Sequence, residues 1–142
     1  MDNTIWRVGT TYIPVHYVEG SAKWYKSNLG ADIMYQDEKK AIINFANQSF
    51  FLVKASEKAT ANFEDSDGNV HFSLTFEVDG LAALENLHQQ FNESGIKIGP
   101  IEDRGHAGRN FIFYDPNGNK FDIWSELSPD FKEKYGINNE YL

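Results

Sequence analysis

The chain has 142 residues, 41% of them hydrophobic, no cysteine, and a formal net charge of −8 at pH 7. This length fits one compact domain with a hydrophobic core and is short for two ordinary independent domains. The negative charge argues against nucleic acid or an anionic membrane as a partner. The lack of cysteine excludes disulfides and thiolate metal sites. Because the sequence shows neither a signal-peptide pattern nor an apolar stretch long enough to span a bilayer, we expect a cytoplasmic protein.

Residues 8–55 carry the pattern of a strand, a helix and three further strands. The segment Thr10 to His16 alternates between two faces, and Pro14 within it predicts an edge or interrupted strand. A helix is predicted to begin at Gly20-Ser21, with Ser21 as its N-cap, and to end at Gly30. The strands that follow are predicted at residues 33–35, 41–45 and 49–54.

Residues 70–127 repeat this order. Strict alternation from Phe72 to Val78 predicts a half-buried strand, and apolar residues at helical spacing from Leu81 to about Ser94 predict a helix that Gly95 ends. A short strand at residues 96–98, a glycine-rich loop at 99–108 and a β-hairpin complete the second copy. An internal repeat of this length predicts a fold more strongly than any single motif does.

Two segments lie outside the repeats. Residues 56–69 are polar and acidic without periodicity, which predicts a linker. Residues 128–142 form an extension in which Ser128-Pro129-Asp130 starts a short helix and Gly136 ends it. The sequence therefore predicts a single α+β domain built from two βαβββ repeats.

The hairpin of the second repeat closes at Asp115-Pro116-Asn117-Gly118, a typical turn sequence. Pairing Tyr114 with Asn119 across this turn sets the predicted register. One face of the hairpin then carries Arg109, Phe111, Phe113, Lys120, Asp122 and Trp124, whereas Ile112, Phe121 and Ile123 face the core. A face that mixes aromatic rings with a cation and a carboxylate suits a small-molecule cleft, and a solvated sheet face would show the same pattern.

The candidate ligand-binding residues share the predicted inner faces of the strands. They are Tyr12, Thr75, Glu77, Arg109, Phe111, Phe113, Asp122 and Trp124. Their aromatic rings could stack on a planar or cationic ligand, or could belong to the core. The carboxylates would favour a cation or accept a proton. In the loop IEDRGHAGR, Arg104, His106 and Arg109 could hold an anionic or carboxylate group of a ligand. The two arginines could instead pair with the neighbouring Glu102 and Asp103 at the surface. We expect this surface pairing for Arg104, whereas Arg109 is expected to point into the cleft beside Trp124.

Three segments, YIPVHYVEGSAKWYKSNLG, HFSLTFEVDG and FYDPNGNKFDIW, resemble the vicinal oxygen chelate superfamily, which contains glyoxalase I, bleomycin-resistance proteins, extradiol dioxygenases and fosfomycin-resistance thiol transferases. The resemblance covers about Thr10 to Glu126. It implies two βαβββ modules whose curved mixed sheets surround a cleft, and commonly a homodimer.

The resemblance also implies where a metal would be bound. Metal-binding members carry histidine, glutamine or glutamate ligands on the first and last strands of both modules. The matching positions here are Thr10, Ser73, the segment 50–53 and Asp122, which supply one carboxylate where three or four ligands are needed. A displaced set of His16, His71 and Asp122 would give the two histidines and one carboxylate that non-haem iron uses.

The resulting prediction is a cytoplasmic, homodimeric protein that binds a small organic molecule in an aromatic cleft without a catalytic metal or other cofactor, and acts by sequestration or sensing. One alternative is a metal-dependent lyase or dioxygenase that uses the displaced ligand set. Another is a non-catalytic interaction module that acts through its dimer surface.

Overall fold

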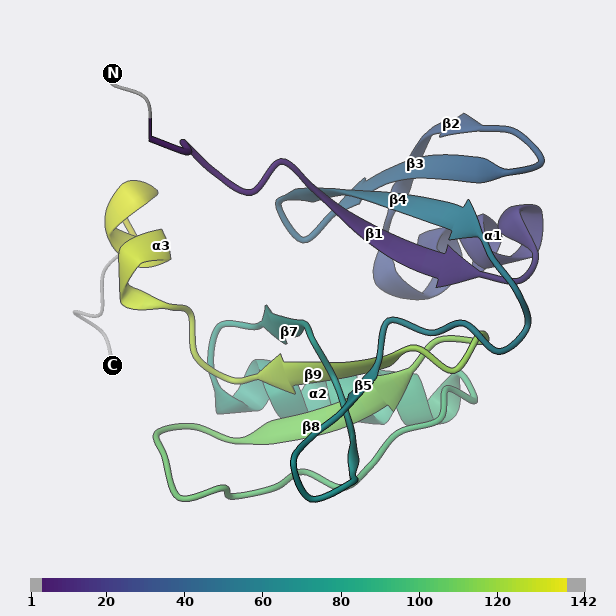
Figure 1. Ribbon diagram of the computed structural model, residues 1–142. Helices are drawn as coiled ribbons and strands as arrows, with labels where there is room; N and C mark the ends of the chain where they lie inside the picture. Colours follow the sequence, from purple (N-terminus) through teal and green to yellow (C-terminus); the bar gives the residue numbers. More distant parts are fainter. Residues whose placement is uncertain (1–3, 138–142) are drawn as a thin grey trace. The chain divides into compact units, whose positions relative to one another are not determined.

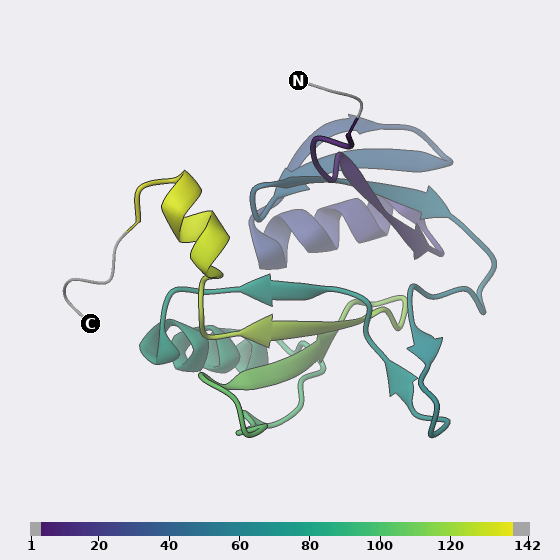
Figure 2. The same ribbon diagram turned by 60° about the vertical axis from the view of Figure 1, so that its left-hand side comes forward.

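A computed structural model describes residues 4–137 and divides the chain into two compact units. Unit 1 comprises the chain up to Ala61 together with Pro116–Asn119, and unit 2 comprises Asn62–Asp115 and the chain from Lys120 onward. Figures 1 and 2 show the elements of each unit. Among the described residues, no helix combines the length and the apolar character needed to cross a membrane.

Unit 1 is a mixed four-stranded sheet with one helix. Its elements are β1 (Thr10–Val15), α1 (Val18–Leu29), β2 (Asp32–Gln36), β3 (Lys40–Phe45) and β4 (Gln48–Lys54). The strand order is β1-β4-β3-β2, with β1 parallel to β4 and the other pairs antiparallel. Alternate residues such as Ile13, Ile43 and Leu52 are buried, as are Ala22 and Tyr25 of α1. The period-2 pattern of the strands therefore forms the core of this unit with the apolar side of α1.

The helix of unit 1 begins earlier than predicted. Tyr17 is its N-cap residue, and the backbone N–H of Ser21 already donates to the carbonyl oxygen of Tyr17 at 2.9 Å. The predicted N-cap at Ser21 is wrong because this residue lies inside the helix, where its hydroxyl accepts a hydrogen bond from Asn117 at 3.2 Å. Gly30 ends the helix as predicted, with a left-handed φ of 71° that glycine adopts without strain.

Unit 2 contains a sheet with the same strand order. Its elements are β5 (Phe63–Glu64), β6 (Val70–His71), β7 (Thr75–Glu77), α2 (Leu81–Glu93), β8 (Asn110–Tyr114), β9 (Lys120–Trp124) and α3 (Pro129–Lys134). In the order β7-β9-β8, β7 is parallel to β9, and β8 is antiparallel to β9. Isolated bridges from Ile98 and Glu102 to β8 stand where unit 1 has β2. The prediction of an α+β fold with two βαβββ modules is confirmed.

Three local predictions have different outcomes in the structure: two need correction and one is confirmed. The strand predicted at residues 96–98 is reduced to the single bridge at Ile98. The segment predicted as a linker contains β5, which pairs with β6 in the short ribbon visible beside the sheet in Figure 2. The short C-terminal helix is confirmed as α3, where the rings of Phe131 and Tyr135 lie 4.7 Å apart and Gly136 has a φ of 67°. The rest of the predicted extension, residues 138–142, lies outside the described residues.

The predicted register of the β8–β9 hairpin is wrong by one residue. The structure pairs Tyr114 with Lys120 and Phe113 with Phe121, so the connecting loop holds five residues, 115–119, instead of four. Because side chains alternate between the faces of a sheet, a slip of one residue turns every β8 side chain to the other face. Phe111 and Phe113 therefore lie in the core against Phe91 of α2, with ring centroids 6.0 and 5.1 Å from it.

The side chains of the hairpin loop explain the extra residue. Asn119 is fully buried within unit 1, where its Nδ2 donates to the carbonyl oxygen of Pro14 at 2.9 Å and its Oδ1 accepts from the backbone N–H of Ala61 at 2.8 Å. Asn117 Oδ1 accepts from the backbone N–H of His16 at 2.8 Å. Since Asn119 is engaged in unit 1, the ladder of unit 2 starts only at Lys120.

Candidate small-molecule site

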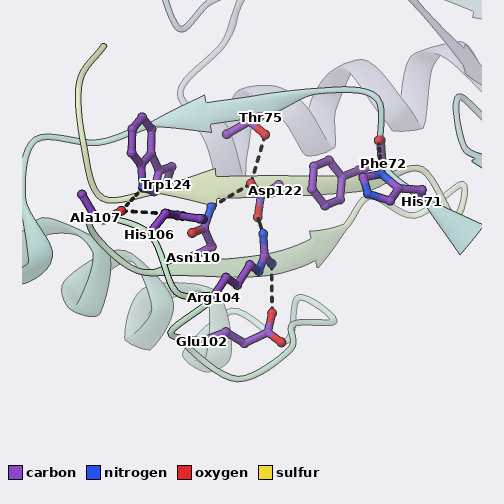
Figure 3. A network of polar contacts seen from close by, with 10 residues as sticks. All are labelled: His71, Phe72, Thr75, Glu102, Arg104, His106, Ala107, Asn110, Asp122 and Trp124. Carbon is purple, nitrogen blue, oxygen red and sulfur yellow. Dashed lines mark hydrogen bonds and ion pairs between the residues drawn. The ribbon is translucent and has the colours of Figure 1, made fainter. Parts of the chain in front are cut away.

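An open pocket of about 620 Å³ lies on the face of the unit 2 sheet opposite α2. It is lined by Phe72, Thr75, Glu77, Arg104, His106, Ala107, Asn110, Asp122 and Trp124, most of which are drawn in Figure 3. Alternate positions of β7 and β9, together with Asn110 of β8, supply its floor, and Arg104, His106 and Ala107 of the loop that precedes β8 supply one wall. Its volume falls in the range typical of small-molecule sites.

Asp122 forms the centre of the floor and is only 2% exposed. Its Oδ2 accepts hydrogen bonds from Thr75 Oγ1 at 3.0 Å and from Asn110 Nδ2 at 2.9 Å. Its Oδ1 accepts from Arg104 Nη1 at 3.1 Å. Both oxygens of this buried carboxylate are thus engaged by protein donors, as a buried charge requires.

Arg104 provides the positive charge that faces Asp122. A second nitrogen of its guanidinium, Nη2, donates to Glu102 Oε1 at 2.9 Å, and the guanidinium carbon lies 5.8 Å from the centre of the Phe72 ring. The prediction that Arg104 pairs with an acidic neighbour at the surface is correct for Glu102 and incomplete, because it leaves out the buried partner. Asp122 is 18 residues away from Arg104 in the sequence, and only the fold brings the two side chains together.

The loop that carries Arg104 is held against β9. Trp124 Nε1 donates to the carbonyl oxygen of Ala107 at 2.9 Å, and the ring of His106 meets Trp124 edge-on with centroids 5.9 Å apart. Gly108 has a φ of 77°, and a Cβ atom at this position would lie 2.6 Å from Ser125 Oγ and 2.8 Å from Trp124 Nε1. The close approach of the loop to β9 therefore requires glycine at this position.

Glu77 forms the end of the pocket beside Trp124, its partner in the β7–β9 ladder. Its carboxylate accepts hydrogen bonds from Ser128, one from the backbone N–H at 2.8 Å and one from the hydroxyl. Both carboxylates that line the pocket are therefore bound by donors of the protein. These two carboxylates outnumber the single arginine among the lining residues, which makes the pocket less favourable for anions than for cations.

Four of the predicted ligand-binding residues, Thr75, Glu77, Asp122 and Trp124, come together in this pocket. Phe111 and Phe113 are in the core as a result of the register. Arg109 does not line the pocket, and its guanidinium lies 3.6 Å from Asp103. Tyr12 belongs to β1 of unit 1, where the residue is 63% exposed and its ring centroid lies 5.2 Å from that of Phe51. Binding of a ligand by these residues stays a prediction.

The sequence interpretation missed Phe72, Ala107 and Asn110 as pocket residues, whereas Arg104 and His106 belong to the loop in which it considered ligand-holding side chains. A predicted hairpin loop of five residues would have identified Asn110 as a pocket residue, because the resulting register places its side chain on the same face as Asp122 and Trp124. Phe72 precedes β7 in an irregular segment, so the alternation assumed from Phe72 to Val78 gave no correct signal for it.

The donor set does not fit a metal ion. Among residues 4–137 there is no group of three or more histidine, aspartate or glutamate side chains that could hold one. His71 does not line the pocket of Asp122; its Nδ1 lies 2.6 Å from the carbonyl oxygen of Phe72, and its ring stacks on Phe63. His16 belongs to unit 1. The displaced ligand set therefore finds no support in the arrangement of these side chains.

Each unit combines one long helix with a mixed sheet, in the order β1-β4-β3-β2 in unit 1 and β7-β9-β8 in unit 2. This repeated arrangement is that of α+β proteins with a glyoxalase-like fold. The family model of the Glyoxalase/Bleomycin resistance protein/Dioxygenase superfamily matches residues 7–123, and the chain belongs to this superfamily. The resemblance seen in the sequence is thereby confirmed.

Solved structures agree with this assignment. Lactoylglutathione lyase from Agrobacterium tumefaciens has a TM-score of 0.66 at 14% identity, over 84% of this chain and 92% of its own. The fosfomycin resistance protein FosX from Listeria monocytogenes, complexed with Mn(II) and sulfate, has a TM-score of 0.71 at 13% identity, over 93% and 99% of the two chains. A search of curated proteins finds no significant match. At sequence identities this low, the similarity of these structures shows a shared fold and nothing about a shared function.

Proposed function

We propose that the pocket of unit 2 binds a small organic molecule and that the protein acts by sequestration or sensing, without a catalytic metal. The observation that carries this proposal is the state of Asp122. Its two oxygens are occupied by Thr75, Asn110 and Arg104, so the carboxylate at the pocket floor is compensated by the chain itself. A metal would have to displace Arg104, and residues 4–137 bring together no group of three or more histidine, aspartate or glutamate side chains that could hold it.

The walls of the pocket favour a planar ligand of neutral or positive charge. Phe72 and Trp124 line the pocket, and each offers a ring face or edge for stacking. The excess of carboxylates over guanidinium groups disfavours an anion and would favour a cation over the Trp124 ring. Members of the superfamily bind small molecules and are commonly dimers. On this basis we also propose a homodimer located in the cytoplasm.

The second candidate is a metal-dependent lyase or dioxygenase. The observation in its favour is the likeness to FosX, which was crystallised with Mn(II) and aligns with a TM-score of 0.71. This candidate requires ligands that the described residues of the chain do not assemble around Asp122. It therefore makes the opposite prediction about chelation.

The test uses the side-chain N–H signal of Trp124 in ¹⁵N-labelled protein. The chain has three tryptophans, and Trp6 and Trp24 of unit 1 serve as internal controls. We expect saturable shifts of the Trp124 signal with indole and with tryptamine, and weaker ones with the anion indole-3-acetate. Phe72→Leu should weaken indole binding, whereas Phe63→Leu, outside the pocket, should leave it unchanged.

The same titration separates the candidates. Binding that persists in excess EDTA, with the probe recovered chemically unchanged, supports sequestration or sensing. Binding lost on chelation, or about one transition metal per purified chain, supports the metal-dependent enzyme. If the Trp124 signal does not respond to any of the three indole probes, the pocket is not a binding site, and the interaction-module alternative takes its place.

A further inference from the structure

Asn110 holds a buried hydrogen-bond acceptor without a partner. The residue is 4% exposed, opens β8 and pairs with Trp124 across the hairpin. Its side chain lines the pocket, and its Oδ1 makes no hydrogen bond within the part of the chain that the structure describes. Native proteins leave few buried polar atoms unsatisfied, so such an atom beside a pocket calls for an explanation.

The orientation of the amide is fixed by its neighbour. Asn110 Nδ2 donates to Asp122 Oδ2 at 2.9 Å, and Figure 3 shows the amide oxygen turned away from that carboxylate. A rotated amide would place Oδ1 against the negative charge of Asp122 and lose this hydrogen bond. The Asp122 carboxylate therefore fixes the amide with Nδ2 toward itself and Oδ1 pointing away.

Several donors that line the pocket make hydrogen bonds within the protein. Thr75 Oγ1 donates to Asp122, and Trp124 Nε1 donates to the carbonyl oxygen of Ala107. The two terminal nitrogens of Arg104 face Asp122 and Glu102. His106 Nδ1 lies 2.8 Å from the carbonyl oxygen of Ala107, an atom that only accepts, so this nitrogen carries the proton.

We propose that Asn110 Oδ1 accepts a hydrogen bond from the ligand, so that the pocket selects planar molecules carrying an N–H or O–H donor on the ring edge. The inference rests on the proposed function and narrows its ligand class. A site built around a buried acceptor discriminates strongly against the same ring system without the donor, because the acceptor then stays unpaired. Asn110 is in this sense a specificity-determining residue.

The experiment compares indole with 1-methylindole, which differ by a single N–H donor. Dissociation constants come from shifts of the Trp124 side-chain N–H signal. We expect wild-type protein to bind indole about tenfold more tightly, the discrimination typical of one hydrogen bond to a buried acceptor. In Asn110→Leu the preference should fall to about twofold or less because the affinity for indole drops.

Thr75→Val is the matched control. It removes a different hydrogen bond to Asp122 and keeps the Asn110 amide, so the affinities for both probes should change together and their ratio should persist. The side-chain amide signals of Asn110 give a readout in wild-type protein, independent of whether Asn110→Leu folds. They should shift with indole and much less with 1-methylindole.

The outcomes distinguish the two proposals. Equal affinity of wild-type protein for both probes overturns the role of Asn110 and leaves the proposed function standing, and it indicates that water satisfies Oδ1. Absence of binding by either probe overturns both. Loss of the preference in Thr75→Val as well as in Asn110→Leu also overturns the inference, because the effect would then come from a loosened Asp122.

Discussion

Replacing Arg104 by methionine tests the pairing on which the site depends. Methionine keeps much of the apolar stem and removes the guanidinium, which leaves the Asp122 carboxylate, with a side chain 3% exposed, in contact with only the two neutral donors Thr75 and Asn110. Removal of one partner from a buried ion pair costs about 3–5 kcal/mol. The Arg104 side chain is 27% exposed and forms a second ion pair, with Glu102. We therefore expect a smaller loss, about 2 kcal/mol, as for one hydrogen bond to a charged group.

The assay is urea unfolding followed by circular dichroism and tryptophan fluorescence, whose coincidence checks for a single transition. Arg109→Met is the matched control from the same loop. That guanidinium, on a side chain 42% exposed, lies 3.6 Å from Asp103, itself 61% exposed, so its removal should cost less than about 0.5 kcal/mol. A double-mutant cycle with Asp122→Asn should give a coupling of about 1–2 kcal/mol. An Arg104→Met variant as stable as Arg109→Met would refute the reasoning.

Three further predictions concern the fold. Phe113→Ala should destabilise by about 3–5 kcal/mol in urea unfolding because the ring is buried against Phe91; an effect under about 1 kcal/mol would instead favour the register in which Phe113 faces the pocket. Asn119→Ala should cost about 1–2 kcal/mol, since the fully buried side chain is lost and two partly buried backbone groups lose their partner, and wild-type stability would contradict the role given to this side chain. Hydrogen bonds from the backbone N–H of Lys39, the Tyr35 hydroxyl and the backbone N–H of Lys40 lower the pKa of Asp37. A carboxyl group with a lowered pKa in the folded state stabilises the fold at pH values above the ordinary aspartate pKa, and this contribution is lost as the pH falls through the lowered value. In Asp37→Asn the free energy of unfolding should therefore fall less steeply between neutral and acidic pH than in wild-type protein. The same pH dependence in both proteins would contradict this role of Asp37.

The Arg104–Asp122 pair also bears on how this chain relates to its superfamily. In this chain the cation next to the pocket carboxylate is a guanidinium from the loop 102–109. A guanidinium forms directional hydrogen bonds and cannot take up ligand oxygens as a metal ion does. The same fold can hold different sites, and the function of this chain must be argued from its own residues.

The sequence by itself determined the class of fold and most of its elements. Alternation in strands such as β1 and β9, helical spacing in α2, and glycine at positions 30 and 136 are local signals, because each depends on which side of a single element is apolar or on one residue's φ. They sufficed for the two βαβββ modules, the short C-terminal helix and the family resemblance. Alternation also placed Thr75 with Glu77 on one face of their strand and Asp122 with Trp124 on one face of theirs, and the resemblance assigned both faces to the cleft.

Only the tertiary structure decided the register of the hairpin and the chemistry of the pocket. The loop of five residues arises because the Asn119 side chain bonds to Pro14, 105 positions away in the sequence, and no local pattern encodes that contact. Because the predicted register was wrong by one residue, it placed Phe111 and Phe113 on the pocket face, where the structure has Asn110. The Arg104–Asp122 pair likewise depends on how a glycine-rich loop lies against β9, which Trp124 and Gly108 fix through contacts made only in the folded chain. Periodicity determines which face of an element is buried, whereas loop length and side-chain partners follow from the contacts of the whole fold.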